Sequence, residues 1–175
     1  SLQILRQIKL GKPTRSFIGM QIAHFGIAVF VIGVTMVGAY QEEKDVRMLA
    51  GDTVSVGGYQ IQLQGVESVP GPNYQAMRGT FTLSKNGSTQ AILYPEKRNY
   101  FSSTMPMTEA AIDIGLTRDL YVSLGEELGD KAWAVRVYYK PFVDWIWGGC
   151  LLMALGGILA MMDKRYRIKI KKVSP

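Results

Sequence analysis

Residues 16–40 read SFIGMQIAHFGIAVFVIGVTMVGAY, and from Phe17 to Tyr40 this stretch carries no formal charge. About 20 consecutive apolar residues are enough to cross the hydrocarbon core of a bilayer as a helix. The stretch therefore predicts a transmembrane helix over residues 16–40, and this helix fixes how the rest of the chain is arranged.

The predicted helix contains His24, the only histidine in the chain. An ionisable side chain in a lipid-spanning helix loses water and needs a partner inside the protein, so it is a candidate for function. Gln21 lies three residues earlier, on the same helical face. The residues alone leave two interpretations of His24 open: a ligand, or a histidine hydrogen-bonded to a neighbouring helix.

A second apolar stretch, residues 142–162, predicts another transmembrane helix. Aromatic residues such as Trp145 and Trp147 gather at its first end, where their amphipathic rings favour the headgroup region. Asp144 is expected to be a first-turn carboxylate stabilised by the helix dipole. A transporter fragment that uses Asp144 and Gln21 along a polar pathway is an alternative function.

Glycines recur in both predicted helices. Gly19, Gly26 and Gly33 repeat every seven residues on a face different from that of His24. Small residues let another helix approach closely within lipid. Four glycines of the second stretch are expected to provide matching surfaces: Gly148, Gly149, Gly156 and Gly157. The first helix then packs on two sides, which requires more neighbours than this chain supplies.

The formal charge of +6 is unevenly distributed along the 175 residues. Ten of the twenty Lys and Arg residues lie in the terminal segments 6–15 and 164–172, whereas residues 41–141 hold ten basic and twelve acidic residues. Basic segments beside apolar spans mark the cytoplasmic side of a membrane. We therefore expect a cytoplasmic amphipathic segment at 1–15, a basic cytoplasmic tail at 163–175, an extracytoplasmic middle, and no nucleic-acid partner.

The middle of the chain, residues 41–141, is long enough for one compact domain. Residues 59–64 alternate apolar and polar side chains, which is typical of a half-buried strand. Asn86-Gly87 between residues 78–85 and 88–94 predicts a hairpin, and further strands are expected at 120–124 and 132–139. The fold class is thus a membrane protein with two transmembrane helices flanking a β-rich, mostly antiparallel barrel or sandwich.

Residues 94–122 depart from simple alternation because they are rich in charges of both signs. They are consistent with an ordered loop that docks on a partner, with Glu96, Arg98, Glu109 and Arg118 as candidate contacts. The residues alone favour the other interpretation, a solvated loop with surface ion pairs. The sequence shows no nucleophile–base arrangement, phosphate-binding loop or paired metal ligands, and the lone Cys150 allows no internal disulfide.

Five stretches together resemble the C-terminal part of CcmF, the haem lyase of bacterial System I cytochrome c maturation. They are GMQIAHFG at 19–26, YPEKR at 94–98, MPMTEAAID at 105–113, RDLYVSLG at 118–125 and KPFVDWIW at 140–147. The resemblance covers nearly the whole chain. It implies a bacterial inner-membrane protein whose β-rich segment lies in the periplasm.

The resemblance also implies a function. The family joins haem to the thiols of a Cys-x-x-Cys-His motif in apocytochrome c, and it holds a structural haem b between transmembrane histidines. His24 matches one of these ligands, with Gln21 beside it on the helix. The family's Trp-rich haem-handling segment is absent from this sequence, so we expect the chain to be a fragment or a subunit, and we assign no enzymatic activity to it alone.

A six-coordinate haem needs ligands on both faces of its iron, and this chain has no second histidine. The second ligand is therefore expected from outside the chain. The partners implied are the remaining helices of the lyase, other cytochrome c maturation proteins, a haem chaperone and apocytochrome c. The alternative function is a non-catalytic, membrane-anchored docking module for these maturation partners.

Overall fold

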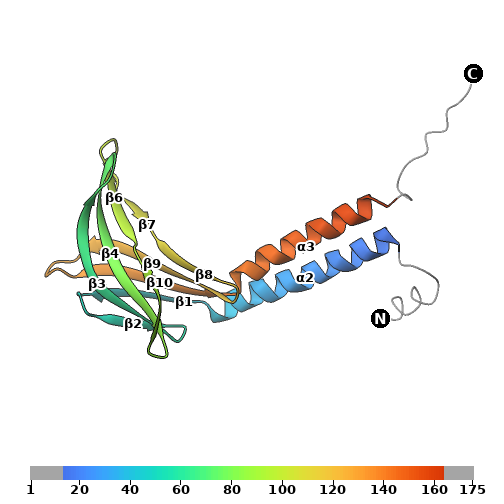
Figure 1. Ribbon diagram of the computed structural model, residues 1–175, viewed down its shortest axis with the longest axis horizontal. Helices are drawn as coiled ribbons and strands as arrows, with labels where there is room; N and C mark the ends of the chain where they lie inside the picture. Colours follow the sequence, from blue (N-terminus) through green and yellow to red (C-terminus); the bar gives the residue numbers. More distant parts are fainter. Residues whose placement is uncertain (1–13, 164–175) are drawn as a thin grey trace, which may run out of the picture. The chain divides into compact units, whose positions relative to one another are not determined.

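A computed structural model describes residues 14–163 of the protein. The chain divides into two units: a helical unit, in which residues up to Thr35 join those from Asp144 onward, and a β unit, Met36–Val143 (Figure 1). The amphipathic segment and the basic tail expected from the sequence lie, apart from residues 14, 15 and 163, outside the described residues.

The two helices are α2, Arg15–Tyr40, and α3, Val143–Met161. Their mean hydropathies reach 2.1 and 1.6, and both are long and apolar enough to cross a membrane. Only 11% of each apolar window is buried inside the protein. The helices are thus not the core of a soluble domain, and the expected fold class, two apolar helices flanking a β-rich domain, is confirmed.

Glycine contacts bring α2 and α3 close together. Gly19, Gly26 and Gly33 are the buried residues of α2, and Gly149 and Gly156 those of α3. A Cβ atom added to Gly26 would lie 2.8 Å from both the Gly149 carbonyl oxygen and the Met153 backbone nitrogen. The close-approach face predicted for α2 is confirmed. In α3 it is confirmed for only two of the four glycines, because a Cβ on Gly148 or Gly157 would meet nothing within 4 Å.

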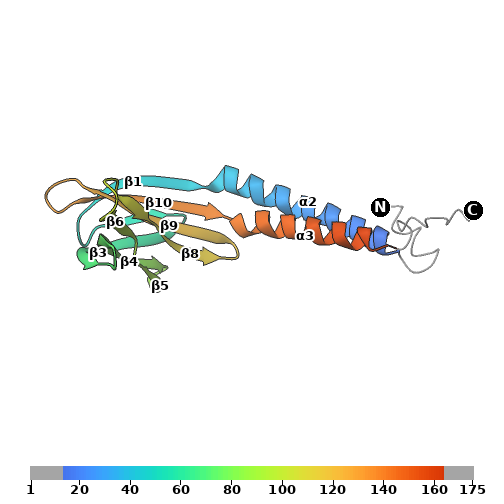
Figure 2. The same ribbon diagram turned by 90° about the horizontal axis from the view of Figure 1, so that it is seen from above.

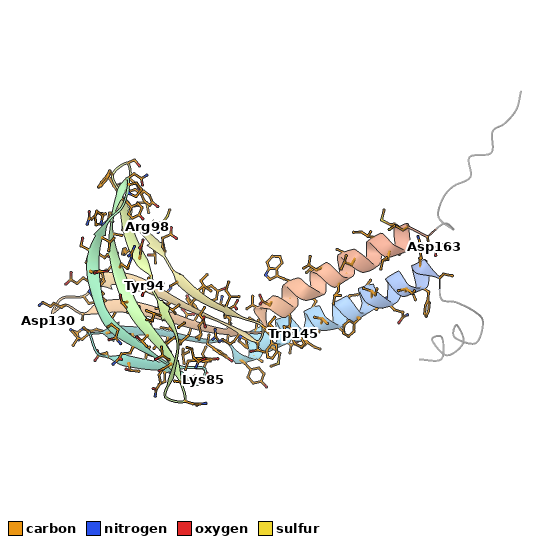
Figure 3. All side chains as sticks on the ribbon, in the orientation of Figure 1. Lys85, Tyr94, Arg98, Asp130, Trp145 and Asp163 are labelled. Carbon is orange, nitrogen blue, oxygen red and sulfur yellow. The ribbon has the colours of Figure 1, made fainter. Side chains whose placement is uncertain are left out.

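A carboxylate from the end of α3 caps the beginning of α2. Asp163 is buried, and its Oδ2 accepts a hydrogen bond of 2.9 Å from the backbone N–H of Ser16 (Figure 3). Thr14 caps the same turn, since its Oγ1 accepts from the N–H of Phe17 at 3.3 Å. The first N–H groups of a helix have no partner within the helix and carry a partial positive charge. Asp163 therefore ties the two helix ends together.

The β unit consists of two antiparallel sheets (Figure 2). Its strands are β1 Glu42–Met48, β2 Thr53–Val56, β3 Tyr59–Pro70, β4 Tyr74–Lys85, β5 Ser88–Leu93, β6 Glu96–Tyr100, β7 Met107–Glu109, β8 Ala111–Gly115, β9 Arg118–Glu127 and β10 Trp133–Pro141. One sheet has the order β1-β10-β9-β8, and the other β2-β3-β4-β6-β7 with β5 paired to β4. Between β7 and β8 the chain passes from one sheet to the other at Ala110.

Alternating side chains from both sheets form the core. Ile61 of β3, Phe81 of β4, and Leu120 and Val122 of β9 are fully buried. The period of two in residues 59–64 correctly predicted β3, and the expected hairpin is present. Its Asn86 and Gly87 have φ of 51° and 77°, the left-handed values that a two-residue turn of this kind requires.

The interpretation of residues 94–122 as an ordered loop was wrong. This segment forms β6, β7, β8 and the start of β9, and only the strand expected at 120–124 was predicted correctly. Pro95 and Pro106 each lie just before a strand, where their missing N–H leaves the ladder intact. The charged side chains fit a sheet because residues on neighbouring strands neutralise one another, an arrangement that only the strand pairing reveals.

The glycine contact between α2 and α3 generates a stability prediction. We expect Gly26→Leu to lower the free energy of unfolding of the helical pair by about 1–3 kcal/mol, because the added side chain must push apart two backbones already in contact. Thermal unfolding followed by circular dichroism in detergent measures the effect.

The matched control is Gly38→Leu, in the same helix, where an added Cβ meets nothing within 4 Å. This variant should unfold at or above the temperature of the unsubstituted protein, since leucine is the better helix former. Equal unfolding temperatures for the two variants would show that the close approach at Gly26 is not required.

Candidate functional site

His24 lies on α2 with its side chain exposed. Its Nδ1 is 2.8 Å from the backbone carbonyl oxygen of Met20, one turn earlier. A carbonyl oxygen only accepts, so Nδ1 carries the proton and donates it. Nε2 is then the nitrogen that the Met20 contact leaves available. Histidines that bind metals commonly donate their other ring N–H to a carbonyl or carboxylate in this way.

The glycine face determines the direction in which His24 extends. Gly26 is two positions after His24 in the sequence, which corresponds to a rotation of about 200° around the helix axis. His24 is therefore on the side of α2 opposite to Gly26, which packs on α3. Gln21, half-buried, lies one turn before His24 on the same side. The surface carrying His24 and Gln21 is thus the one on which a further element could pack.

The chemistry of this surface fits one axial ligand of a haem. Imidazole nitrogen is a common ligand of haem iron. His24 is the only histidine in the sequence, and residues 14–163 contain no group of three or more His, Cys, Asp or Glu side chains that could hold a metal ion. Among the described residues, His24 is therefore a candidate for one ligand of such a site, and a complete coordination sphere would need groups from elsewhere.

Three of the four candidate docking residues come together on the β4-β6-β7 part of the six-stranded sheet. Glu96 is buried, and its Oε1 and Oε2 accept hydrogen bonds from Nε of Arg78 at 2.7 Å and Nε of Arg98 at 2.8 Å. Arg98 also reaches Oε1 of Glu109 at 3.5 Å and covers the ring of Tyr74, 4.7 Å from its centroid (Figure 3). Glu96 is therefore an internal anchor, while Arg98 and Glu109 reach the surface.

The two arginines keep Glu96 ionised. Burial acts to raise the pKa of Glu96, but the hydrogen bonds from Arg98 and Arg78 outweigh it and hold the pKa below its ordinary value. The same carboxylate raises the pKa of Arg98. A buried carboxylate between two guanidinium groups positions those groups but is itself shielded from any partner.

Arg118, the fourth candidate, lies in a separate cluster around the buried Tyr59. Its Nε donates to the Tyr59 hydroxyl at 3.0 Å, and its guanidinium forms an ion pair with Asp113. Lys85 donates to the same hydroxyl at 3.3 Å. Burial acts to raise the pKa of Tyr59, but the hydrogen bonds from Arg118 and Lys85 outweigh it and lower the pKa. Figure 3 shows Lys85 and Arg98 at opposite ends of the β unit, so Arg118 does not join the Glu96 cluster.

Sequence reasoning did not identify the apolar side chains around the β6–β7 connection. Phe101, Met105 and Met107 are 76%, 77% and 52% exposed. Met107 is the register partner of Arg98, so this apolar surface adjoins the charged one. Phe101 and Met105 lie between Pro95 and Pro106, and Met107 follows Pro106 directly. These positions are visible in the sequence, but the exposure of the side chains depends on how β6 and β7 pair.

A separate cleft of about 490 Å³ opens on the four-stranded sheet. Small side chains, Ser123, Gly125 and Ala134, line part of it, and Asp45 and Arg136 stand beside them. That pair is already joined by two hydrogen bonds, Nε to Oδ1 at 2.5 Å and Nη2 to Oδ2 at 2.7 Å. Asp45 and Arg136 therefore make the cleft polar, but because they pair with each other neither is available as a catalytic group.

Comparison with known proteins gives a consistent family assignment. Residues 39–141 match the family model described as the CcmF C-terminal beta-sandwich. The chain is 54% identical over 158 residues to "Cytochrome c-type biogenesis protein CcmF" of Pseudomonas aeruginosa, covering 90% of the chain and 24% of the relative. It is 50% identical over 164 residues to the protein of the same name from Escherichia coli, covering 94% and 25%.

A solved structure shares the fold. "Cytochrome c Heme Lyase CcmF" aligns with a TM-score of 0.69 at 21% identity, over 85% of this chain and 25% of that one. The chain thus spans about a quarter of the length of the relatives it matches. The family model covers more than half of the chain, the relatives are about half identical to it, and the fold agrees. The chain belongs to the CcmF family.

Proposed function

We propose that this chain is the C-terminal portion of a cytochrome c haem lyase, in which His24 is an axial ligand of haem b. The observation that supports this most directly is the hydrogen bond from His24 Nδ1 to the Met20 carbonyl. It fixes the tautomer that leaves Nε2 able to bind iron, on the side of the helix opposite to Gly26. The relatives named as CcmF give the proposal its biological setting.

In this proposal the chain's residues position and insulate the site. The Met20 carbonyl orients the His24 ring, which lies on the apolar helix α2. Gln21 lies on the same face, one turn away, where its amide can contact a bound group. Haem, when bound, supplies a redox-active iron. The second axial ligand comes from outside the chain, and the assembled lyase joins haem to the Cys-x-x-Cys-His thiols of apocytochrome c.

We place α2 and α3 across the bacterial inner membrane, with both termini in the cytoplasm and the β unit in the periplasm. The support is the concentration of Lys and Arg in segments 6–15 and 164–172. The domain limits proposed are a basic segment at 1–15, membrane helices at 16–40 and 142–162, a periplasmic domain at 41–141 and a tail at 163–175. The partners proposed are the remaining helices of the lyase, other maturation proteins and the haem chaperone.

The haem-ligand proposal predicts a spectroscopic loss. In membranes containing the assembled maturation complex, His24→Gly should remove most of the b-type Soret absorbance per unit of protein. Added imidazole should restore part of it, because a free ligand can enter the space left by the side chain. Absorbance spectra of the reduced complex, normalised by immunoblot, provide the measurement.

Gln21→Ala is the control on the same face and should retain most of the haem. Imidazole rescue distinguishes ligation from a structural role, since a misfolded variant would not recover its spectrum. An unchanged Soret band in His24→Gly, together with normal cytochrome c maturation, would refute the assignment.

A second candidate function is docking of maturation partners by the β unit. The favouring observation is the surface where exposed Phe101, Met105 and Met107 adjoin Arg98 and Glu109. Exposed apolar and methionine side chains beside charged groups are typical of protein-binding surfaces. Apocytochrome c is the partner that we propose for this surface. Docking and haem binding can coexist in one lyase.

Charge reversal tests the docking surface. Glu109→Lys should reduce the capture of apocytochrome c by the membrane complex several-fold, because it places a cation beside Arg98 at the edge of the surface. The fold should persist, since the Glu109 side chain is 44% exposed. Co-purification of tagged apocytochrome c measures the capture.

Glu127→Lys is a matched control with the same change of charge at an exposed position, at the end of β9. It should leave capture unchanged, and both variants should keep the b-type haem. Capture by Glu109→Lys equal to that of the unsubstituted protein would exclude Glu109 from the docking surface. An equal loss in both variants would show a general charge effect and would also contradict the proposal.

A further inference from the structure

Strand β8 presents apolar side chains outward at the edge of the four-stranded sheet. Ile112, Ile114 and Leu116, spaced by two residues, are 45%, 70% and 81% exposed. Side chains at i, i+2 and i+4 extend from one face of a strand and its immediate continuation. The alternating residues Ala111 and Asp113 are half-buried. The β8–β9 hairpin therefore carries an apolar stripe whose exposure increases toward its turn.

This turn lies at the end of the β unit from which the chain continues into α3. The backbone N–H of Phe142 donates to the carbonyl of Thr117 in the turn, at 3.0 Å. Pro141 is paired with Arg118 in the β10–β9 register. Helix α3 begins at Val143, the residue after Phe142. Leu116, the most exposed side chain of the stripe, is thus next in sequence to Thr117, whose carbonyl is hydrogen-bonded to Phe142 just before α3.

A lysine and two tyrosines lie beside the stripe. Tyr121 is the register partner of Ile112, and Lys140 Nζ is 5.5 Å and 5.3 Å from the ring centroids of Tyr121 and Tyr138. Lysine and tyrosine combine an apolar body with a polar tip, and tyrosine is enriched where hydrocarbon meets headgroups. The apolar stripe and its neighbours have the composition of a membrane-interface surface.

Nearby carboxylates are engaged within the protein. Asp113 pairs with Arg118, and Oδ1 of Asp119 accepts from the N–H of Gly115 at 3.3 Å. Oε1 of Glu43, the register partner of Tyr138, lies 3.6 Å from Nε of Arg136. These contacts limit the repulsion that anionic headgroups would otherwise meet here. Charge and hydrophobicity therefore both favour a phospholipid surface as the occupant.

We propose that the β8–β9 hairpin inserts Ile114 and Leu116 into the interfacial region of the membrane that α2 and α3 cross, with Lys140 directed to lipid phosphates. The inference rests on the membrane placement proposed above, and not on haem binding. The hairpin is then a third membrane contact of the β unit, besides its covalent links to the two helices.

Site-directed spin labelling tests this. In a Cys150→Ala background, cysteine replaces one leucine at a time: Leu116 in the hairpin, Leu128 in the β9–β10 connection, or Leu155 in α3. Each leucine is more than half exposed, at 81%, 53% and 55%, so labelling should not disturb the core. Leu116 and Leu128 flank opposite ends of β9, about 30 Å apart for a ten-residue strand.

The labelled chain is reconstituted in nanodiscs of phosphatidylcholine and phosphatidylglycerol, and relaxation by oxygen is compared with relaxation by a water-soluble nickel chelate. We expect the oxygen-to-nickel ratio at Leu116 to exceed that at Leu128 several-fold and to approach that at Leu155. The proposal would be overturned if the label at Leu116 were as accessible to nickel as the label at Leu128. It would also be overturned if the label at Leu116 were shielded from both reagents, because that result indicates that protein covers the hairpin. A water-exposed label at Leu155 would instead contradict the proposal that α3 crosses the membrane, and the hairpin inference would fail with it.

Discussion

The close contact between α2 and α3 at their glycines is the constraint on which the candidate haem site depends. Gly26 and Gly149 bring backbone atoms together, and a Cβ on Gly26 would lie only 2.8 Å from the facing carbonyl oxygen. Because of that contact, one face of α2 packs on α3 and His24 lies on the opposite face. Lipid tails are as apolar as the side chains of the helices, so the hydrophobic effect does not drive helix association in a membrane. Dispersion and close backbone packing drive it instead. The glycines thus determine both the pairing of α2 with α3 and the side of α2 on which the imidazole of His24 lies.

In the β unit, ion pairs determine how a charged segment can enter a sheet. Glu96 is buried between Arg78 and Arg98, one from the neighbouring strand and one two residues away on its own strand. Removing a carboxylate from water is costly unless hydrogen bonds replace its hydration. Lys97, on the opposite face of β6, pairs with Glu126 of the other sheet. Adjacent residues of one strand therefore serve two purposes: Glu96 organises the outer surface, and Lys97 joins the two sheets.

The sequence predicted those features that depend on local patterns. Hydropathy located both helices, alternation located β3, and Asn86-Gly87 located the β4–β5 turn. It did not predict that residues 96–100, 107–109 and 111–115 form strands, because the charges that interrupt the alternation are compensated only across strands. The separation of Arg118 from Glu96 was missed for the same reason: Tyr59, its partner, is 59 residues away in sequence. For the haem proposed at His24 the sequence offers no second histidine ligand.

If His24 ligates haem as proposed, its orientation explains why the two axial ligands would come from different segments of the lyase. A histidine exposed on an apolar helix loses hydration without gaining a partner from α3, since α3 occupies the other side. The Met20 carbonyl satisfies one ring nitrogen but leaves the other unsatisfied by that contact. Packing of a further helix with a bound haem would satisfy it and bury the exposed face of α2 in the same step. Haem binding and helix assembly are then thermodynamically linked, because each stabilises the state that the other requires. In such a design a lyase whose helices are incompletely assembled binds haem weakly, and haem in turn stabilises the assembled form.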